Sequence, residues 1–421
     1  MKQFYAILQL CLLSVLTLWA DPAGQSAVVA QGKDGPLTAS LVTCWPGQEI
    51  YELYGHSALR IRGEGIDSVW NYGVFDFREP NFVGRFVSGQ TDYMVMGYPF
   101  AWFLPEYKRR GSRVVEQDLN LTPEEVRDLR RRLQIASLPQ NRKYRYNYIK
   151  DNCATRITDR LAETTGSVLL LRGNQRYGSY RDEMRYYNRN YPWYQLGIDV
   201  ALGSGLDMPI GLVNEMFVPV EMKERLDSAR WSDGRPVVST ERELLPGRED
   251  SVLPPTPWWA APLTWSAVVF VLSVILAVLD YRRHRLSRWW YSLWFGLLGL
   301  AGCLVAFLVF VSSHEATSPN ILLLWLNPLQ LIIAAGVWWR RIRPAVLAMA
   351  ICDIVVMICM LLGWAFQSQS ANPAFFPLMA ATLVSAAAYA IIDTSCSYKN
   401  TPPSADDHKK TLRKGGKRKR A

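Results

Sequence analysis

Histidine and cysteine are scarce in this chain. Only four of the 421 residues are histidine, and His56 is the only one before residue 284. The region 37–250 contains only two cysteines, Cys44 and Cys153. One histidine and two scattered cysteines fall short of a zinc ligand set. The sequence therefore predicts no metal site, and we expect no cofactor.

Charged residues are scarce in much of the second half of the chain. Five apolar stretches there can each cross a bilayer, since a helix needs about 20 residues at ~1.5 Å rise to do so. Tryptophan occurs at several of their ends, as is typical of the membrane interface. The predicted spans are Trp258–Leu279, Trp289–Val311, Ile321–Trp339, Ala345–Phe366 and Phe375–Ile392.

Lysine and arginine are absent from two of the loops between these spans, 312–320 and 367–374. The loops 281–288 and 340–343 and the tail 409–420 are strongly basic. The positive-inside rule places the basic segments in the cytoplasm and the region before the first span outside the cytoplasmic membrane. We interpret the basic runs as orientation signals and not as nucleic-acid sites. The expected location is the bacterial inner membrane, with a periplasmic N-terminal domain and a cytoplasmic tail.

The N-terminus agrees with export. Lys2 precedes an apolar run from Phe4 to Trp19, which is typical of a secretory signal peptide or, if uncleaved, of an anchor. A charged, proline-rich stretch before the first span indicates a linker. The expected organisation is a signal peptide or anchor (1–30), a periplasmic domain (37–220), a membrane-proximal linker (221–257), a five-span transmembrane domain (258–393) and a basic cytoplasmic tail (394–421).

The exported region has the pattern of a mixed α+β domain. Alternating residues predict strands over 54–62 and 68–75. Thr122-Pro-Glu-Glu125 predicts a helix start, because Thr122 can cap and Glu125 can complete a capping box. The expected fold class is therefore an α+β exported domain followed by an all-α bundle of five transmembrane helices.

Cys153 is placed to be reactive. Asp151 or Asn152 is expected to cap a helix that begins at Cys153. Backbone N–H groups and the helix dipole at a first turn stabilise a thiolate, so we interpret Cys153 as a nucleophile. The alternative is a disulfide with Cys44, because the periplasm is oxidising and the count of cysteines allows that pair.

His56 is the candidate base, since histidine is the usual general base at neutral pH. The alternative is an ordinary strand histidine bonded to a carbonyl. Spacing does not identify the residue that would orient the imidazole. The candidates for an orienting or supporting role, each of which has a solvated, capping or ion-pairing alternative, are Glu52, Asp76, Asp151, Asn152 and Arg156.

Three motifs carry a resemblance to a known family. They are Tyr54-Gly-His-Ser-Ala-Leu-Arg, Trp70-Asn-Tyr-Gly-Val-Phe-Asp-Phe77 and Tyr146-Asn-Tyr-Ile-Lys-Asp-Asn-Cys-Ala-Thr-Arg156. Together they resemble the Lnb family of lipoprotein intramolecular transacylases. The similarity extends into the membrane part at Pro319-Asn-Ile-Leu-Leu-Leu-Trp-Leu-Asn-Pro328. An exported domain followed by five spans is also the layout of that family.

The resemblance implies an activity and its residues. A cysteine attacks an ester-linked acyl chain on the diacylglyceryl group of a lipoprotein, and the chain passes to the N-terminal amine, which leaves a lyso-form lipoprotein. By matching motifs the nucleophile would be Cys153 and its base His56. The order of histidine before cysteine also resembles NlpC-type peptidases and lecithin–retinol acyltransferase, which implies a permuted papain-like core. The partners would be the membrane and an embedded lipoprotein or phospholipid substrate.

Two ionisable groups of the membrane part are further candidates. Asp353 lies inside the fourth span, where a carboxyl is either functional or bonded between helices. His314 lies in an extracytoplasmic loop, where it could contact a lipid headgroup. Two other functions stay open: a Cys–His hydrolase of cell-wall peptide or lipid ester, and a non-catalytic, disulfide-stabilised membrane scaffold.

Overall fold

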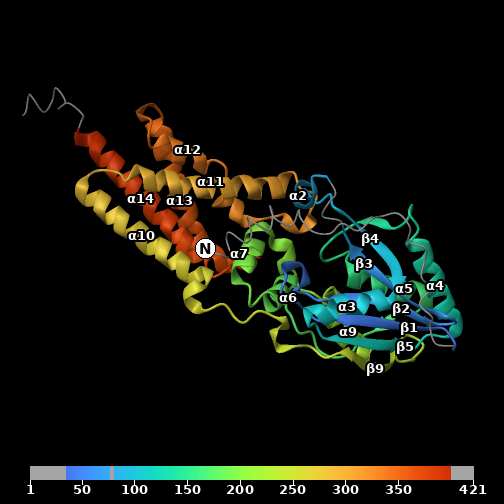
Figure 1. The fold of residues 1–421 in the computed structure, drawn as a ribbon. Coiled ribbons are helices and arrows are strands. Elements are labelled where there is room, and N and C mark those ends of the chain that lie inside the picture. The colour runs from blue at the N-terminus through green and yellow to red at the C-terminus, as the bar shows by residue number, and fades with distance from the viewer. Residues whose placement is uncertain (1–34, 76–79, 400–421) are drawn as a thin grey trace, which may run out of the picture.

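The computed structural model of the chain describes residues 35–75 and 80–399. The predicted signal or anchor segment, Asp76 and most of the basic tail lie outside the described residues. Figure 1 shows two parts, an α+β domain and a bundle of long helices, with the short helices α6 (Tyr180–Tyr187) and α7 (Pro192–Ala201) between them. The predicted combination of an α+β domain and a helical membrane region is confirmed.

A seven-stranded antiparallel sheet forms the frame of the α+β domain. The two central hairpin strands lie next to each other because a two-residue turn at Glu64 and Gly65 joins them. The strand order is β6 (Lys143–Arg145), β4 (Asp92–Pro99), β3 (Ile66–Val74), β2 (His56–Gly63), β1 (Thr38–Cys44), β5 (Val114–Leu119) and β9 (Val238–Leu245).

Helices cover both faces of this sheet. On one face α4 (Pro123–Ala136), α5 (Cys153–Thr165) and α9 (Pro219–Ser228) pack over a core that includes Leu41, Leu59 and Trp70. On the other face α3 (Phe100–Arg110) packs over a core that includes Cys44 and Ala58. Alternate residues of β1 and β2 thus enter different cores, as the period of a strand requires.

The capping box predicted for α4 is present. The Thr122 hydroxyl accepts from the Glu125 N–H at 3.2 Å, and the Glu125 carboxylate accepts from the Thr122 N–H at 2.7 Å. The predicted linker is wrong in part, because 221–257 includes most of α9 and all of β9. Its charges misled the prediction: Glu221, Lys223 and Arg225 are buried in ion pairs.

Four helices are long and apolar enough to cross a membrane among the described residues: α10 (Pro262–Arg283), α11 (Arg288–Phe310), α13 (Arg343–Gly363) and α14 (Phe375–Lys399). The third expected span, Ile321–Trp339, is not one helix. It consists of a 3₁₀ helix, Ile321–Leu324, and the short α12 (Gln330–Gly336). Pro328 explains the interruption, because proline removes a helical hydrogen bond. The expectation of five continuous helices is therefore corrected to four and one broken segment.

Polar side chains hold this broken segment. Gln330 donates to the Trp325 carbonyl at 3.2 Å and to the Asp353 carboxyl at 2.8 Å. Carbonyls released by a break in a membrane helix need such partners, since no water is present in the bilayer core. Asp353 is thus bonded between helices, as one of its two interpretations predicted.

The two loops that lack lysine and arginine lie against the α+β domain. Arg181 is fully buried and donates to Asp199 and Asp207, in both cases at 2.8 Å. These two carboxylates accept from Asn372 at 2.9 Å and from the Ser370 N–H at 3.1 Å. The loop 312–320 likewise binds the helix α2 (Phe82–Val87). The outer ends of the membrane helices are thereby fixed to the domain that precedes them.

Candidate active site

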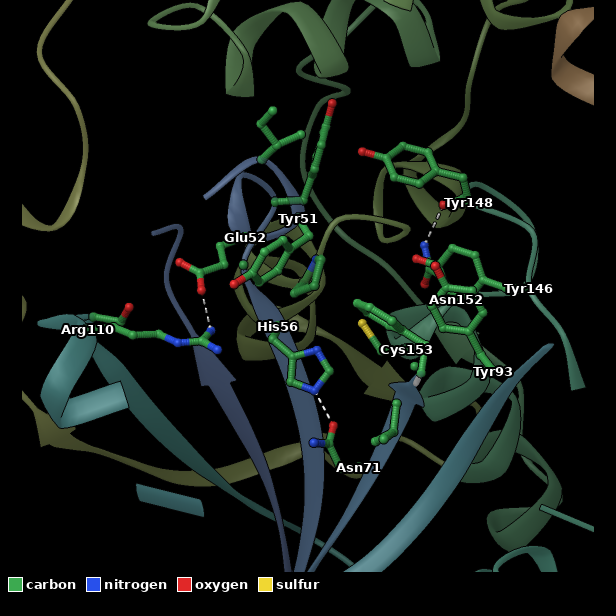
Figure 2. A pocket seen from close by; sticks show the side chains of 18 of the residues that line it. Tyr51, Glu52, His56, Asn71, Tyr93, Arg110, Tyr146, Tyr148, Asn152 and Cys153 are labelled. Carbon is green, nitrogen blue, oxygen red and sulfur yellow. Dashed lines mark hydrogen bonds and ion pairs between the residues drawn. The ribbon is translucent and has the colours of Figure 1, made fainter. Parts of the chain in front are cut away.

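A pocket of about 630 Å³ opens where β2 begins, and both Cys153 and His56 line it. Cys153 is the first residue of α5, whose body packs on one face of the sheet. His56 is the first residue of β2. Figure 2 shows the sulfur of Cys153 pointing toward the His56 ring. The fold thus brings together the two candidates that the sequence singled out.

The cap of α5 fixes the position of Cys153. The Asn152 side chain accepts from the N–H groups of Ala154 and Thr155, and Thr155 reaches back to the Asn152 N–H at 2.8 Å. The Asn152 amide also donates to the carbonyls of Tyr148 and Phe217, both at 2.9 Å. Asn152 is therefore a buried capping residue that holds the start of α5, and its side chain bonds to backbone groups and not to the imidazole.

Asn71 is the partner of His56, and sequence reasoning missed it. The Nε2 atom of His56 bonds to the Oδ1 atom of Asn71, whose amide donates to the Tyr98 hydroxyl at 3.0 Å. Because the Asn71 oxygen accepts, Nε2 carries the proton and Nδ1 is left to face the sulfur of Cys153. The three side chains form a Cys–His–Asn chain of the kind that activates a thiol.

The strand pattern contained a signal for Asn71. Ala58 is paired with Asn71 across the β2–β3 hairpin. Since residues two apart in a strand share a face, His56 and Asn71 lie on the same face of neighbouring strands. A register assignment for this hairpin would therefore have identified Asn71 as a candidate.

The pKa values of the pair move in opposite directions. Burial raises the pKa of the Cys153 thiol, but the charge and hydrogen bond of His56, together with the N–H groups of Ser57 and Ala154, outweigh it, so the pKa is lowered. Burial lowers the pKa of His56, but the Cys153 thiolate and the bonds to Cys153 and Asn71 leave it raised. This arrangement favours a thiolate beside an imidazolium.

Cys44 is not bonded to Cys153. Both are free thiols, and Cys44 is buried beneath α3 while Cys153 packs against the core on the other face. Burial holds the pKa of the Cys44 thiol well above its usual range. The disulfide alternative is therefore absent from this structure, and Cys44 behaves as an apolar core residue.

The other expected supporting residues bond to partners other than His56. Asp151 pairs with Arg156, whose guanidinium stacks 3.7 Å above the Tyr144 ring. Both support the turn before Cys153. Glu52 lines the pocket and pairs with Arg110 at 2.8 Å. Burial raises the pKa of Glu52 in spite of this cation.

The two candidates of the membrane part do not line this pocket. The His314 Nε2 atom lies 2.8 Å from the carbonyl oxygen of Phe86. Asp353 lies in α13, bonded to Gln330. Within 35–75 and 80–399 no group of three or more His, Cys, Asp or Glu side chains is arranged to hold a metal ion.

Comparisons with known proteins assign the chain to a family. The model of the Lnb N-terminal periplasmic domain matches residues 33–190, and that of the Lnb transmembrane domain matches residues 255–396. No curated protein and no solved structure matches the chain. The first matched segment includes six of the seven strands of the sheet, and the second covers nearly all of the helical bundle, in their expected order. The chain therefore belongs to the Lnb family and is an inner-membrane protein with a periplasmic N-terminal domain.

Proposed function

We propose that this protein is a thiol acyltransferase that moves an ester-linked acyl chain of a lipoprotein's diacylglyceryl group to the lipoprotein's N-terminal amine. Family membership supports a membrane enzyme that modifies lipoproteins. The observation that carries the finer proposal is the Cys153–His56–Asn71 chain in a pocket held at the outer ends of the membrane helices. A helix-start thiolate beside an imidazole suits nucleophilic attack on an ester.

In the first half-reaction His56 Nδ1 takes the proton of Cys153, and the thiolate attacks the ester carbonyl. The N–H group of Cys153 and the helix dipole at the start of α5 stabilise the negative charge that develops on the carbonyl oxygen. The carbon–oxygen bond to glycerol then breaks, and His56 returns the proton to the departing alkoxide. The products are an acyl-thioester on Cys153 and a lysoglyceryl group.

In the second half-reaction the N-terminal amine of the lipoprotein attacks the thioester. His56 takes a proton from the amine, and the carbon–sulfur bond breaks to restore the thiolate. An amine held beside the thioester has a high effective concentration, which favours aminolysis over hydrolysis. Asn71 keeps the imidazole in the tautomer and orientation that both halves need.

Two finer assignments accompany this function. The order of His56 before Cys153, with the helix of the nucleophile packed on an antiparallel sheet, supports a permuted papain-like core. We also assign residues 1–30 to a signal peptide or anchor and the tail from 394 to the cytoplasm. The substrate would be a lipoprotein whose acyl chains remain in the outer leaflet beside the periplasmic domain.

Mass spectrometry of lipoprotein N-termini tests the function. Cells that produce the wild-type protein should contain N-acylated lyso-lipoproteins, whereas cells that produce Cys153→Ser should contain unmodified diacylglyceryl forms. Cys44→Ser is the matched control, since it alters the other thiol of the same domain. Release of free fatty acid without N-acylation would assign a hydrolase instead, and an unchanged acylation state would refute both.

A further inference from the structure

One wall of the pocket consists of aromatic rings in sequential contact. Ring-centre distances are 6.3 Å for Phe86–Phe82, 6.0 Å for Phe82–Phe75, 5.1 Å for Phe75–Tyr93 and 4.0 Å for Tyr93–Tyr146. All five residues line the same pocket as Cys153. We call this set, Phe86, Phe82, Phe75, Tyr93 and Tyr146, the aromatic ladder. Figure 2 shows Tyr93 and Tyr146 on the Cys153 side of the pocket.

The far end of the ladder is anchored to the membrane bundle. His314, in the loop after α11, bonds to the Phe86 carbonyl, and its ring lies 6.2 Å from the Phe86 ring. Ser313 donates to the carbonyls of Ser88 and Gly89, both at 3.0 Å. A Cβ atom at Gly89 would lie 2.7 Å from the Ser313 hydroxyl, so only glycine permits this approach. Figure 1 shows α2 beside the end of α11.

The surface around this anchor is apolar and exposed. Phe86 and Val83 of α2 are 49% and 63% exposed, and Phe310 and Val311 at the end of α11 are 73% and 66% exposed. Exposed apolar side chains at the outer end of a membrane helix lie where hydrocarbon meets the interface. The ladder therefore begins at the surface that lipid occupies and ends beside the sulfur of Cys153.

The opposite wall of the pocket is charged. It contains the ion-paired Glu52 and Arg110, with Glu106 bonded to the same arginine. The ladder itself contains no charged side chain. Because apolar surface gains free energy when an apolar chain covers it, the two walls distinguish an acyl chain from a polar headgroup or amine.

We propose that the aromatic ladder binds the acyl chain of a membrane-anchored ester and guides it from the outer leaflet to Cys153. This inference rests on the proposed thiol acyltransferase function and specifies how its substrate is bound. The four successive ring contacts, with ring centres 4.0–6.3 Å apart, offer an acyl chain a continuous apolar surface to cover. His314 acts as a positioning residue for α2.

The test uses the full-length protein in nanodiscs and compares acylation of Cys153 by p-nitrophenyl palmitate and p-nitrophenyl acetate. The double variant Phe82→Ala/Phe86→Ala should slow palmitoylation at least about tenfold and leave acetylation within about twofold, since only the long chain contacts the ladder. Trp102→Ala is the matched control, because Trp102 is an equally exposed aromatic residue outside the pocket. Phe82→Leu/Phe86→Leu should restore most of the palmitoylation.

If the double variant slows palmitoylation and acetylation equally, or slows neither, the ladder does not bind the acyl chain. Acylation of Cys153 in the wild-type protein would then still support the transferase. Absence of any thioester in the wild-type protein would refute the transferase first. A second measurement does not need catalysis. Cys153→Ser protein in nanodiscs that contain a phospholipid with a photoreactive acyl chain should crosslink at 82–93. Crosslinks confined to the membrane helices would contradict binding of the acyl chain by the ladder. Crosslinks that an apolar peptide displaces but excess lipid does not would contradict it as well.

Discussion

Cys44 and Cys153 lie in the same domain and compartment but in opposite surroundings. Cys44 ends β1 and is buried beneath α3, where burial holds its pKa well above the usual range. Cys153 begins α5 and lines the pocket, where His56 and backbone N–H groups lower its pKa. Cys44 is even paired in register with His56 on the neighbouring strand. The comparison shows that hydrogen-bond donors and a facing imidazole, more than proximity in the sheet, lower the pKa of a thiol.

The largest expected effect separates the two thiols directly. Cys153→Ser should lower acyl transfer at least about 1,000-fold, because the nucleophile is lost while the pocket keeps its shape. The measurement is the rate of N-acylation of a purified diacylglyceryl lipoprotein in nanodiscs. Activity of Cys153→Ser comparable to that of the wild-type protein would show that another group is the nucleophile, and the contrast between Cys153 and Cys44 would then have no functional meaning.

The second prediction concerns the cause of the lowered pKa. In the wild-type protein, alkylation of Cys153 should stay fast as pH falls below the usual thiol range and decline only below its lowered pKa. His56→Ala removes the imidazolium, so burial dominates and the thiolate fraction at pH 7 should drop about tenfold for each unit that the pKa rises. The readout is iodoacetamide alkylation against pH. An unchanged profile would show that His56 does not face the sulfur.

A smaller effect is expected at Asn71, which acts through His56. Asn71→Ala should lower acyl transfer by up to about 100-fold, since a freely rotating imidazole is misplaced for much of the time. Because the hydrogen bond to Asn71 contributes to the raised pKa of His56, its loss should lower that pKa. The alkaline limb of the pH profile of acylation, where the imidazolium loses its proton, should therefore move to lower pH. Loss of stability with an unmoved pH profile would reduce Asn71 to a structural role.

The smallest expected effect is at Cys44. Cys44→Ala should leave acyl transfer within about threefold, because Cys44 does not line the pocket. The lost core volume should lower the free energy of unfolding by about 1 kcal/mol. Thermal unfolding measures that loss in the same preparation. Strong inactivation of a folded Cys44→Ala protein would contradict the view of Cys44 as a core residue.

Local signals explain which elements could be predicted. The capping box at Thr122 and the caps of α5 depend on residues a few positions apart, and the structure has both. The charges and prolines of the segment 221–257 predicted a linker, but several of those charges are buried. Buried ion pairs depend on partners from other elements, such as Arg225 with Glu215, and such pairs leave no local pattern.

In the membrane part, too, local sequence predicted some features, and contacts between distant segments decided others. Hydropathy identified all five stretches, but only four became long helices. Pro328 was visible in the sequence, whereas the hydrogen bonds from Gln330 to Trp325 and Asp353 that stabilise the break need two helices in contact. An interrupted helix is stable in a bilayer only where such partners exist.

The sequence by itself determined the two-part organisation and the helix that begins at Cys153. Because histidine is scarce, it also left His56 as the only candidate histidine base of its domain. These properties follow from composition and short spacing. Only the tertiary structure decided that Asn71 holds the imidazole, that Cys44 stays apart from Cys153, and that α2 joins the pocket to the end of α11. The physical reason is that each depends on strand register or on side-chain contacts between segments distant in the chain.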